Sequence, residues 1–70
     1  MAINPVPATA REKKSAETRV DRAIDLLRHE PHACALAKRN RDRLIRFAIL
    51  TPSATADKIA TGVRISSMGL

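Results

Sequence analysis

Four side chains that can bind metal lie within six residues near the middle of this 70-residue chain. They are two imidazoles, a carboxylate and a thiol, and zinc binds all three types: His29, Glu30, His32 and Cys34. A structural zinc site needs four well-placed ligands, but Pro31 interrupts the helix that would align these four. No second Cys/His group is present to complete a site. The pattern therefore predicts the end of one helix and the start of another, with no bound metal.

Cys34 is the only cysteine, so the chain forms no internal disulfide. Catalysis by Cys34 or by a serine would need a general base, a third residue that orients the base, and a pocket for the substrate. Seventy residues leave little chain to build that pocket, and the only glycines, Gly62 and Gly69, do not form a phosphate-binding loop. The sequence therefore predicts a binding protein that has no enzymatic activity and no cofactor.

Basic side chains are the main chemical feature of the chain. The formal net charge is +6, and residues 32–50 hold five cations against one acid, Asp42. Four of these cations are arginines, whose planar guanidinium can bind a phosphate at two points. With one acid in the segment, we expect the arginines to be available to a phosphate backbone or an acidic partner. The predicted binding residues are Lys38, Arg39, Arg41, Arg43, Arg46, Lys58 and Arg64.

A first helix is predicted from about residue 10 or residue 16 to residue 29. Thr9 and Glu12 have the spacing of a capping box at the first of these starts, and Ser15 is the candidate cap at the second. Pro31 should end the helix, because the residue before a proline is disfavoured in helical conformation. The apolar residues follow helical spacing and should form one buried face: Ala16, Val20, Ala23, Ile24 and Leu27.

Two more helices are predicted, over residues 32–50 and 53–61. In the second helix, an apolar stripe should face the core and lie opposite an arginine face. The stripe contains Leu36, Leu44, Phe47 and Ala48, with Ala37 and Leu50 at its edges, and the opposite face contains Arg39, Arg43 and Arg46. Thr51 or Ser53 should begin the third helix, and Gly62 should end it as a left-handed cap. Residues 63–70 are left open between strand, helix and disorder.

The predicted fold class is therefore all-α. It is a small three-helix domain over residues 10–62, with an extended N-terminal arm over residues 1–9 and a short tail over residues 63–70. Pro5 and Pro7 favour the extended arm, in which Ile3 and Val6 are the predicted docking residues for a protein partner. A core of small side chains is expected to be marginal, so partner binding or homodimerisation would add to its stability.

No apolar run is long enough for a membrane span or a signal peptide. We therefore expect a cytoplasmic protein. Binding to a membrane surface is disfavoured, because the basic helix has no tryptophan and only one phenylalanine to anchor it.

Residues 55–68 resemble the helix-turn-helix of transcription regulators. Ile59 and Ala60 fit the first helix of that family, Val63 and Ile65 fit the aliphatic places around the turn, and Ser66 fits the start of the recognition helix. The resemblance implies a protein that works on transcription. A recognition helix beginning at Ser66 would be too short to fill a major groove, so we expect attachment to a larger complex more than base readout.

The expected function is a small basic regulator of transcription that binds RNA polymerase or its nucleic acid through the arginine-rich helix. Phage-type inhibitors and antiterminators are proteins of this kind. The alternative is a peripheral structural subunit of a ribonucleoprotein or other large assembly. The chain has no Tyr or Trp, which disfavours binding modes that stack single-stranded bases on aromatic side chains. Whether the partner is DNA, RNA or protein is left open.

Overall fold

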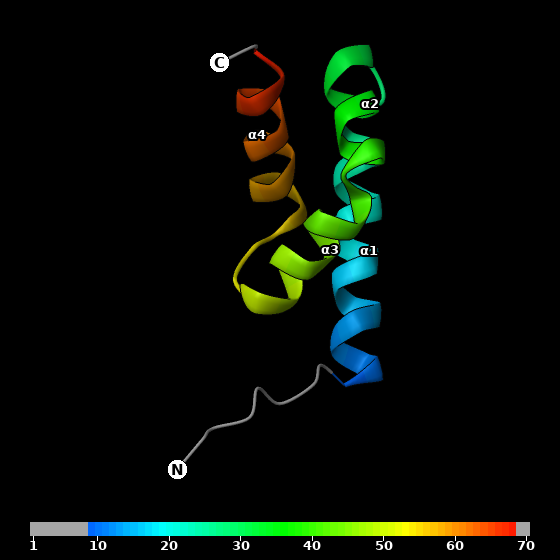
Figure 1. Ribbon diagram of the computed structural model, residues 1–70, viewed down its shortest axis with the longest axis vertical. Helices are drawn as coiled ribbons and strands as arrows, with labels where there is room; N and C mark the ends of the chain where they lie inside the picture. The colour runs from blue at the N-terminus through cyan, green and yellow to red at the C-terminus, as the bar shows by residue number, and fades with distance from the viewer. Residues whose placement is uncertain (1–8, 69–70) are drawn as a thin grey trace.

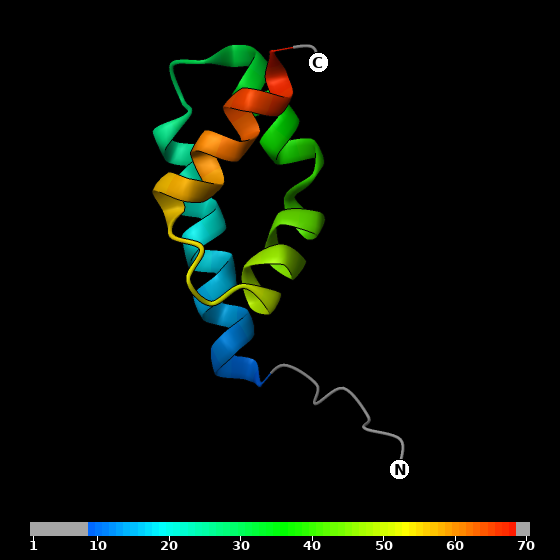
Figure 2. The same cartoon turned by 90° about the vertical axis from the view of Figure 1, so that its left-hand side faces the viewer.

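The computed structural model describes residues 9–68. These residues are all-α, as predicted, and contain four helices and no strand: α1 (Ala10–Leu26), α2 (Pro31–Arg39), α3 (Arg41–Leu50) and α4 (Ala56–Ser67). α1 runs along the long axis of the molecule, and the other three helices pack around it (Figures 1 and 2). α2 also packs against α4, whereas α3 and α4 barely touch each other.

α1 begins and is buried as the sequence predicts. The Thr9 hydroxyl accepts a hydrogen bond from the Glu12 N–H at 3.2 Å, which satisfies a free donor of the first turn. The helix ends at Leu26, three residues before the predicted end, because the chain tightens into a turn. In that turn the Leu27 N–H bonds to the Ala23 and Ile24 carbonyls. The predicted apolar face is buried, with Ile24 at its edge.

The core consists mainly of small side chains. Seven of its twelve buried residues are alanines, and Leu27 and Val20 are the largest side chains that are fully buried. Alanine stabilises a core little through its own area, but it lets helix backbones approach closely. The buried residues are Ala16, Val20, Ala23, Leu27, Ala33, Ala37, Ile45, Ala48, Ala54, Ile59, Ala60 and Val63.

The prediction of one helix over residues 32–50 is wrong, because the chain bends at Asn40 between α2 and α3. Asn40 has φ −105° and ψ 22°, outside regular helical values. Its side-chain amide donates to the Leu36 carbonyl at 3.1 Å, and its backbone N–H donates to the same carbonyl at 3.0 Å. Asparagine often ends a helix in this way, because its side chain competes for backbone partners.

The bend also changes which residues are buried. The predicted stripe placed Phe47 in the core and Leu50 at its edge, but these side chains are 49% and 77% exposed. Ile45 and Ala48 take the buried positions of α3, while Leu36 and Leu44 are half-buried. The alanine-rich side of α2 and α3 therefore faces the core, and the larger apolar residues lie toward α4.

The third helix differs from its predicted bounds of 53–61 at both ends. Thr55 caps α4, through a hydroxyl that accepts from the Lys58 N–H at 3.3 Å. The helix continues through Gly62, so most of the predicted 63–70 tail is helical. The stop predicted at Gly62 is wrong because Ile59, Ala60 and Val63 are buried on both sides of it. Such packing outweighs the weak helix propensity of one glycine, about 1 kcal/mol.

Replacing Gly62 with alanine should stabilise the protein by about 0.4–1 kcal/mol. A Cβ atom built at this position meets nothing within 4 Å, and alanine restricts the unfolded chain more than glycine does. Urea denaturation of the two proteins would measure the difference. Equal or lower stability of the Gly62→Ala variant would mean that the backbone at this position needs glycine.

A candidate binding surface on α2, α3 and α4

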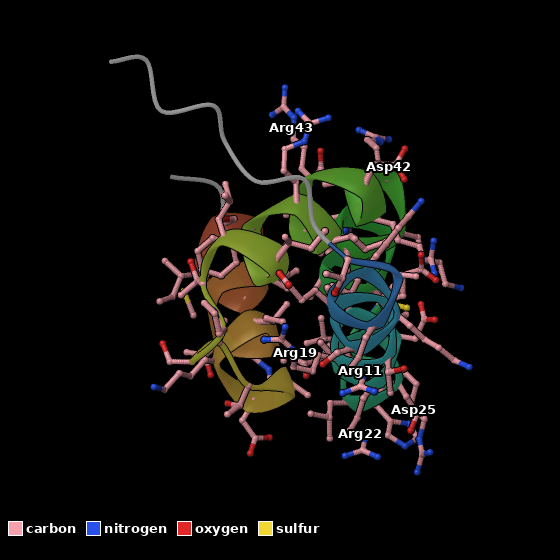
Figure 3. All side chains as sticks on the ribbon, turned by 90° about the horizontal axis from the view of Figure 1, so that it is seen from below. Arg11, Arg19, Arg22, Asp25, Asp42 and Arg43 are labelled. Atoms are coloured by element: carbon pink, nitrogen blue, oxygen red, sulfur yellow. The ribbon has the colours of Figure 1, made fainter. Side chains whose placement is uncertain are left out.

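Arg19 holds the end of α3 and the following loop against α1. One guanidinium nitrogen, Nη2, donates to the Ala48 carbonyl at 3.0 Å. The other, Nη1, donates to the Ala54 carbonyl at 2.7 Å and to the Pro52 and Thr51 carbonyls at 3.3 and 3.5 Å. Figure 3 shows the side chain pointing from α1 toward this loop. The last carbonyls of a helix lack partners and carry partial negative charge, so a cation suits this place.

Two of the predicted binding residues instead pair with acids that lie far from them in the chain. Arg41 Nε lies 2.9 Å from Asp21 of α1, and this hydrogen bond lowers the pKa of the Asp21 carboxyl below its usual value. Arg64 of α4 binds Glu30, the residue before α2, with Nε 2.9 Å from both carboxylate oxygens. The expectation that the arginines of residues 32–50 stay unpaired is therefore wrong for Arg41. Its acid comes from a different helix.

The remaining basic residues of α2 and α3 form an exposed group that we call the basic ridge. It consists of Lys38, Arg39, Arg43 and Arg46, which are all exposed. None of the four has an ion pair among the described residues. The prediction that Arg39, Arg43 and Arg46 share one face of a single helix is wrong, because Arg39 belongs to α2 and the other two to α3, on either side of the bend at Asn40. Arg43 projects on the opposite side of the molecule from Arg22 of α1 (Figure 3).

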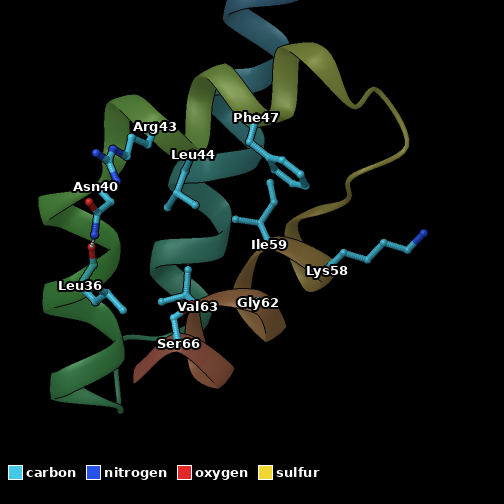
Figure 4. Close-up of a pocket in the computed structure, with 10 residues that line it drawn as sticks. All are labelled: Leu36, Asn40, Arg43, Leu44, Phe47, Lys58, Ile59, Gly62, Val63 and Ser66. Atoms are coloured by element: carbon cyan, nitrogen blue, oxygen red, sulfur yellow. Dashed lines mark hydrogen bonds between the residues drawn. The ribbon is translucent and has the colours of Figure 1, made fainter. Parts of the chain in front are cut away.

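A hollow of about 320 Å³ lies beside the basic ridge, between α2 and α3 on one side and α4 on the other. We call it the α3–α4 groove. Its apolar side chains point toward one another from both sides (Figure 4). The groove exists because α3 and α4 both pack against α1 but diverge from each other. It is lined by Leu36, Asn40, Arg43, Leu44, Phe47, Lys58, Ile59, Gly62, Val63 and Ser66.

The charged side chains that line the groove are both basic. Arg43 and Lys58 are its only charged lining residues, and Figure 4 places them at opposite ends. The structure thus gives the groove one cation from α3 and one from α4, whereas Arg41 and Arg64 lie in their separate ion pairs. Both groove cations were predicted binding residues. Their relation across an apolar groove could not be inferred from their separation in the chain.

Phe47 lines the groove, although the sequence pattern predicted it to be in the core. The only aromatic side chain of the protein is half-exposed at the edge of the groove. Aromatic side chains bury large areas and often dominate interfaces, so one left half-exposed in a domain with an alanine-rich core suggests a docking surface. Asn40 is the residue in the sequence that could have indicated this exposure. Asparagine is typical of helix ends, and a helix break at Asn40 changes which of the following residues face the core.

Three further predictions concern the N-terminal docking arm, a metal site and a membrane span. Ile3 and Val6 lie outside the described residues. Within residues 9–68, no three His, Cys, Asp or Glu side chains gather as metal ligands would. No helix in that part of the chain combines the length and hydropathy needed to cross a bilayer.

No family model, curated protein or solved structure matches the chain. The resemblance of residues 55–68 to a helix-turn-helix therefore stays a prediction. In the structure, these residues start at the cap of α4 and run through the helix without a turn up to Ser67.

Proposed function

We propose that this protein is a non-enzymatic, cytoplasmic regulator of transcription that attaches to a transcription complex through the basic ridge. The partner is RNA polymerase or its nucleic acid, and the ridge contacts phosphate groups. The observation that carries this proposal is that four exposed cations lie close together on α2 and α3, at positions 38, 39, 43 and 46. Arg19, Arg41 and Arg64 are held by internal carbonyls or carboxylates, whereas the ridge cations are exposed and have no ion pair among the described residues.

Electrostatic contact with a phosphate backbone fits this surface better than base readout does. Arginine and lysine side chains that neutralise phosphates release bound counterions, which supplies most of the affinity in sequence-independent binding. A binding mode of this kind needs exposed cations on a rigid element, which α2 and α3 provide. It does not require stacked aromatic side chains.

The test is the salt dependence of binding to labelled DNA and RNA duplexes of about 20 base pairs, starting at about 50 mM salt. The variant replaces Lys38, Arg39 and Arg46 with glutamine, which removes three ridge cations and leaves the groove residue Arg43 in place. We expect weaker binding and a salt slope shallower by up to about 3, roughly 0.9 for each phosphate that is no longer neutralised.

The matched control removes the same charge from α1, by replacing Lys13, Lys14 and Arg22 with glutamine. These three side chains are exposed, and their loss should reduce affinity much less. If both triple variants bind alike, net charge alone is responsible and the ridge is not the binding surface. If the parent protein binds neither duplex at about 50 mM salt, direct nucleic-acid binding is excluded.

The transcription part of the proposal has its own readout. Full-length protein, added to RNA polymerase from the source cell, should change transcript yield or termination, and the ridge variant should do so less. Recovery of the protein with ribonucleoprotein particles, abolished by nuclease treatment, together with no effect on transcription, would favour the structural-subunit alternative.

A further inference from the structure

The α3–α4 groove has the length and shape to accept a helix. The α4 residues that line it, from Lys58 to Ser66, span about 12 Å at 1.5 Å per residue, or about two turns. On the other side, the lining residues come from α2, from the bend at Asn40 and from α3, where Arg43, Leu44 and Phe47 recur at helical spacing. Two such rows form the sides of a groove into which a third helix can pack.

The middle of the groove is open to a partner. Gly62 is exposed there, and a Cβ atom built on it meets nothing within 4 Å. Glycine lets another backbone approach closely. The exposed Phe47 and the half-buried Leu36 and Leu44 supply apolar contact area around it. An occupant would therefore insert apolar side chains, as amphipathic helices do in helix-in-groove recognition.

Charge decides which kind of occupant fits. The groove is apolar inside, and its charged lining residues, Arg43 and Lys58, are both basic. Arg39 lines a second hollow next to it, which shares Leu36 and Ser66 with the groove. Complementarity across an interface places carboxylates opposite such a rim.

Two other occupants fit this rim poorly. A second copy of the chain carries a formal charge of +6, and two basic rims brought together repel each other. The N-terminal residues 1–9 of the chain itself contain apolar side chains but no acid. Residues 1–9 therefore provide no carboxylate for the rim, and a second copy would bring 13 cations against seven acids.

We propose that the α3–α4 groove binds an acidic amphipathic helix of a partner protein. Apolar residues of that helix, at positions i, i+3 or i+4 and i+7, contact Leu44, Phe47 and Ile59. Flanking Asp or Glu side chains pair with Arg43 and Lys58. This site shares Arg43 with the basic ridge, but it does not depend on the ridge–phosphate contact proposed above.

The test is selection from a displayed library of random peptides of about 16 residues, or roughly 24 Å as a helix, on the full-length protein. We expect the enriched peptides to combine helically spaced apolar residues with Asp or Glu. Their affinity should fall at least about 10-fold for a Gly62→Leu variant, because the new side chain fills the groove. Leucine is also a better helix former than glycine, so this variant should remain folded.

The matched control is Thr61→Leu, which places the same side chain at the neighbouring exposed position outside the groove. It should bind the selected peptides as the parent does. Circular dichroism and thermal unfolding of both variants confirm that each is folded. The Lys38, Arg39 and Arg46 glutamine variant should retain most peptide binding, whereas Gly62→Leu should retain duplex binding, so the two proposed sites fail separately.

Three results would overturn the groove proposal. The first is failure to enrich any peptide above a selection without protein. The second is enrichment of peptides that lack acidic residues or that bind Gly62→Leu as well as the parent. The third is loss of duplex DNA or RNA binding in Gly62→Leu with peptide binding unchanged, which would assign the groove to nucleic acid.

Discussion

Replacing Arg19 with glutamine should lower the free energy of unfolding by about 2–4 kcal/mol. Hydrogen bonds to a charged group contribute about 1.5–3 kcal/mol each, and the Arg19 guanidinium makes two of 3.0 Å or shorter, to Ala48 and Ala54. Glutamine is shorter and uncharged, so it leaves the carbonyls at the end of α3 and in the following loop without this donor. Domains of this size have total stabilities of roughly 4–10 kcal/mol, so the loss is a large share.

Urea denaturation of the full-length chain measures the effect, with Arg22→Gln as the control. Arg22 lies on the same helix and is exposed, so the identical chemical change there should alter stability by about 0.5 kcal/mol or less. Arg19→Lys should fall between the parent and Arg19→Gln, because an ammonium keeps the charge but not the planar fork that reaches both carbonyls. Equal destabilisation by Arg19→Gln and Arg22→Gln would show that the Arg19 hydrogen bonds contribute nothing measurable.

The second large effect is expected from Ala60→Leu, which should destabilise the fold by about 1–3 kcal/mol. Ala60 is 0% exposed and lies in a core whose α1 members Ala16 and Ala23 are also alanines with no exposure. A longer side chain must force neighbouring helices apart or adopt a strained rotamer, because close-packed interiors have little space for added methylene groups.

Comparing leucine at three consecutive positions of α4 separates the effect of core volume from the effect of the leucine itself. Ala60→Leu adds bulk to the core, Thr61→Leu adds it to the exposed face, and Gly62→Leu adds it to the groove. Thermal unfolding should show a fall of roughly 4–8 °C per kcal/mol of stability for Ala60→Leu and no comparable fall for the other two. A melting temperature for Ala60→Leu equal to that of Thr61→Leu would mean that the core tolerates the added volume.

If the predictions for Arg19→Gln and Ala60→Leu both hold, the positions of the groove and the ridge depend on the Arg19 hydrogen bonds and on the packing at Ala60. Arg19 holds the end of α3 against α1, and the alanine packing allows α4 to approach α1 closely. The divergence of α3 from α4, which opens the groove, follows from these two constraints on helices that share α1 as a neighbour. Variants at Arg19 or Ala60 should therefore weaken peptide binding as well as stability, whereas Gly62→Leu should affect peptide binding alone.

The sequence by itself determined the features that depend on neighbours in the chain. It predicted an all-α domain, the start of α1 at Thr9, the buried face of α1 and the concentration of cations in residues 32–50. Caps, proline boundaries and helical spacing are local, so these residue patterns carry enough information to predict them.

The tertiary structure alone decided which of those cations are available and where the apolar groove lies. Asp21 and Glu30 pair with arginines 20 and 34 positions away, and Arg19 bonds to carbonyls 29 to 35 positions away. Because α4 packs on α1, it continues as a helix through Gly62. Because the chain bends at Asn40, the Phe47 side chain is exposed and not in the core. These outcomes depend on contacts between helices, whose geometry the spacing of residues within any one helix does not contain.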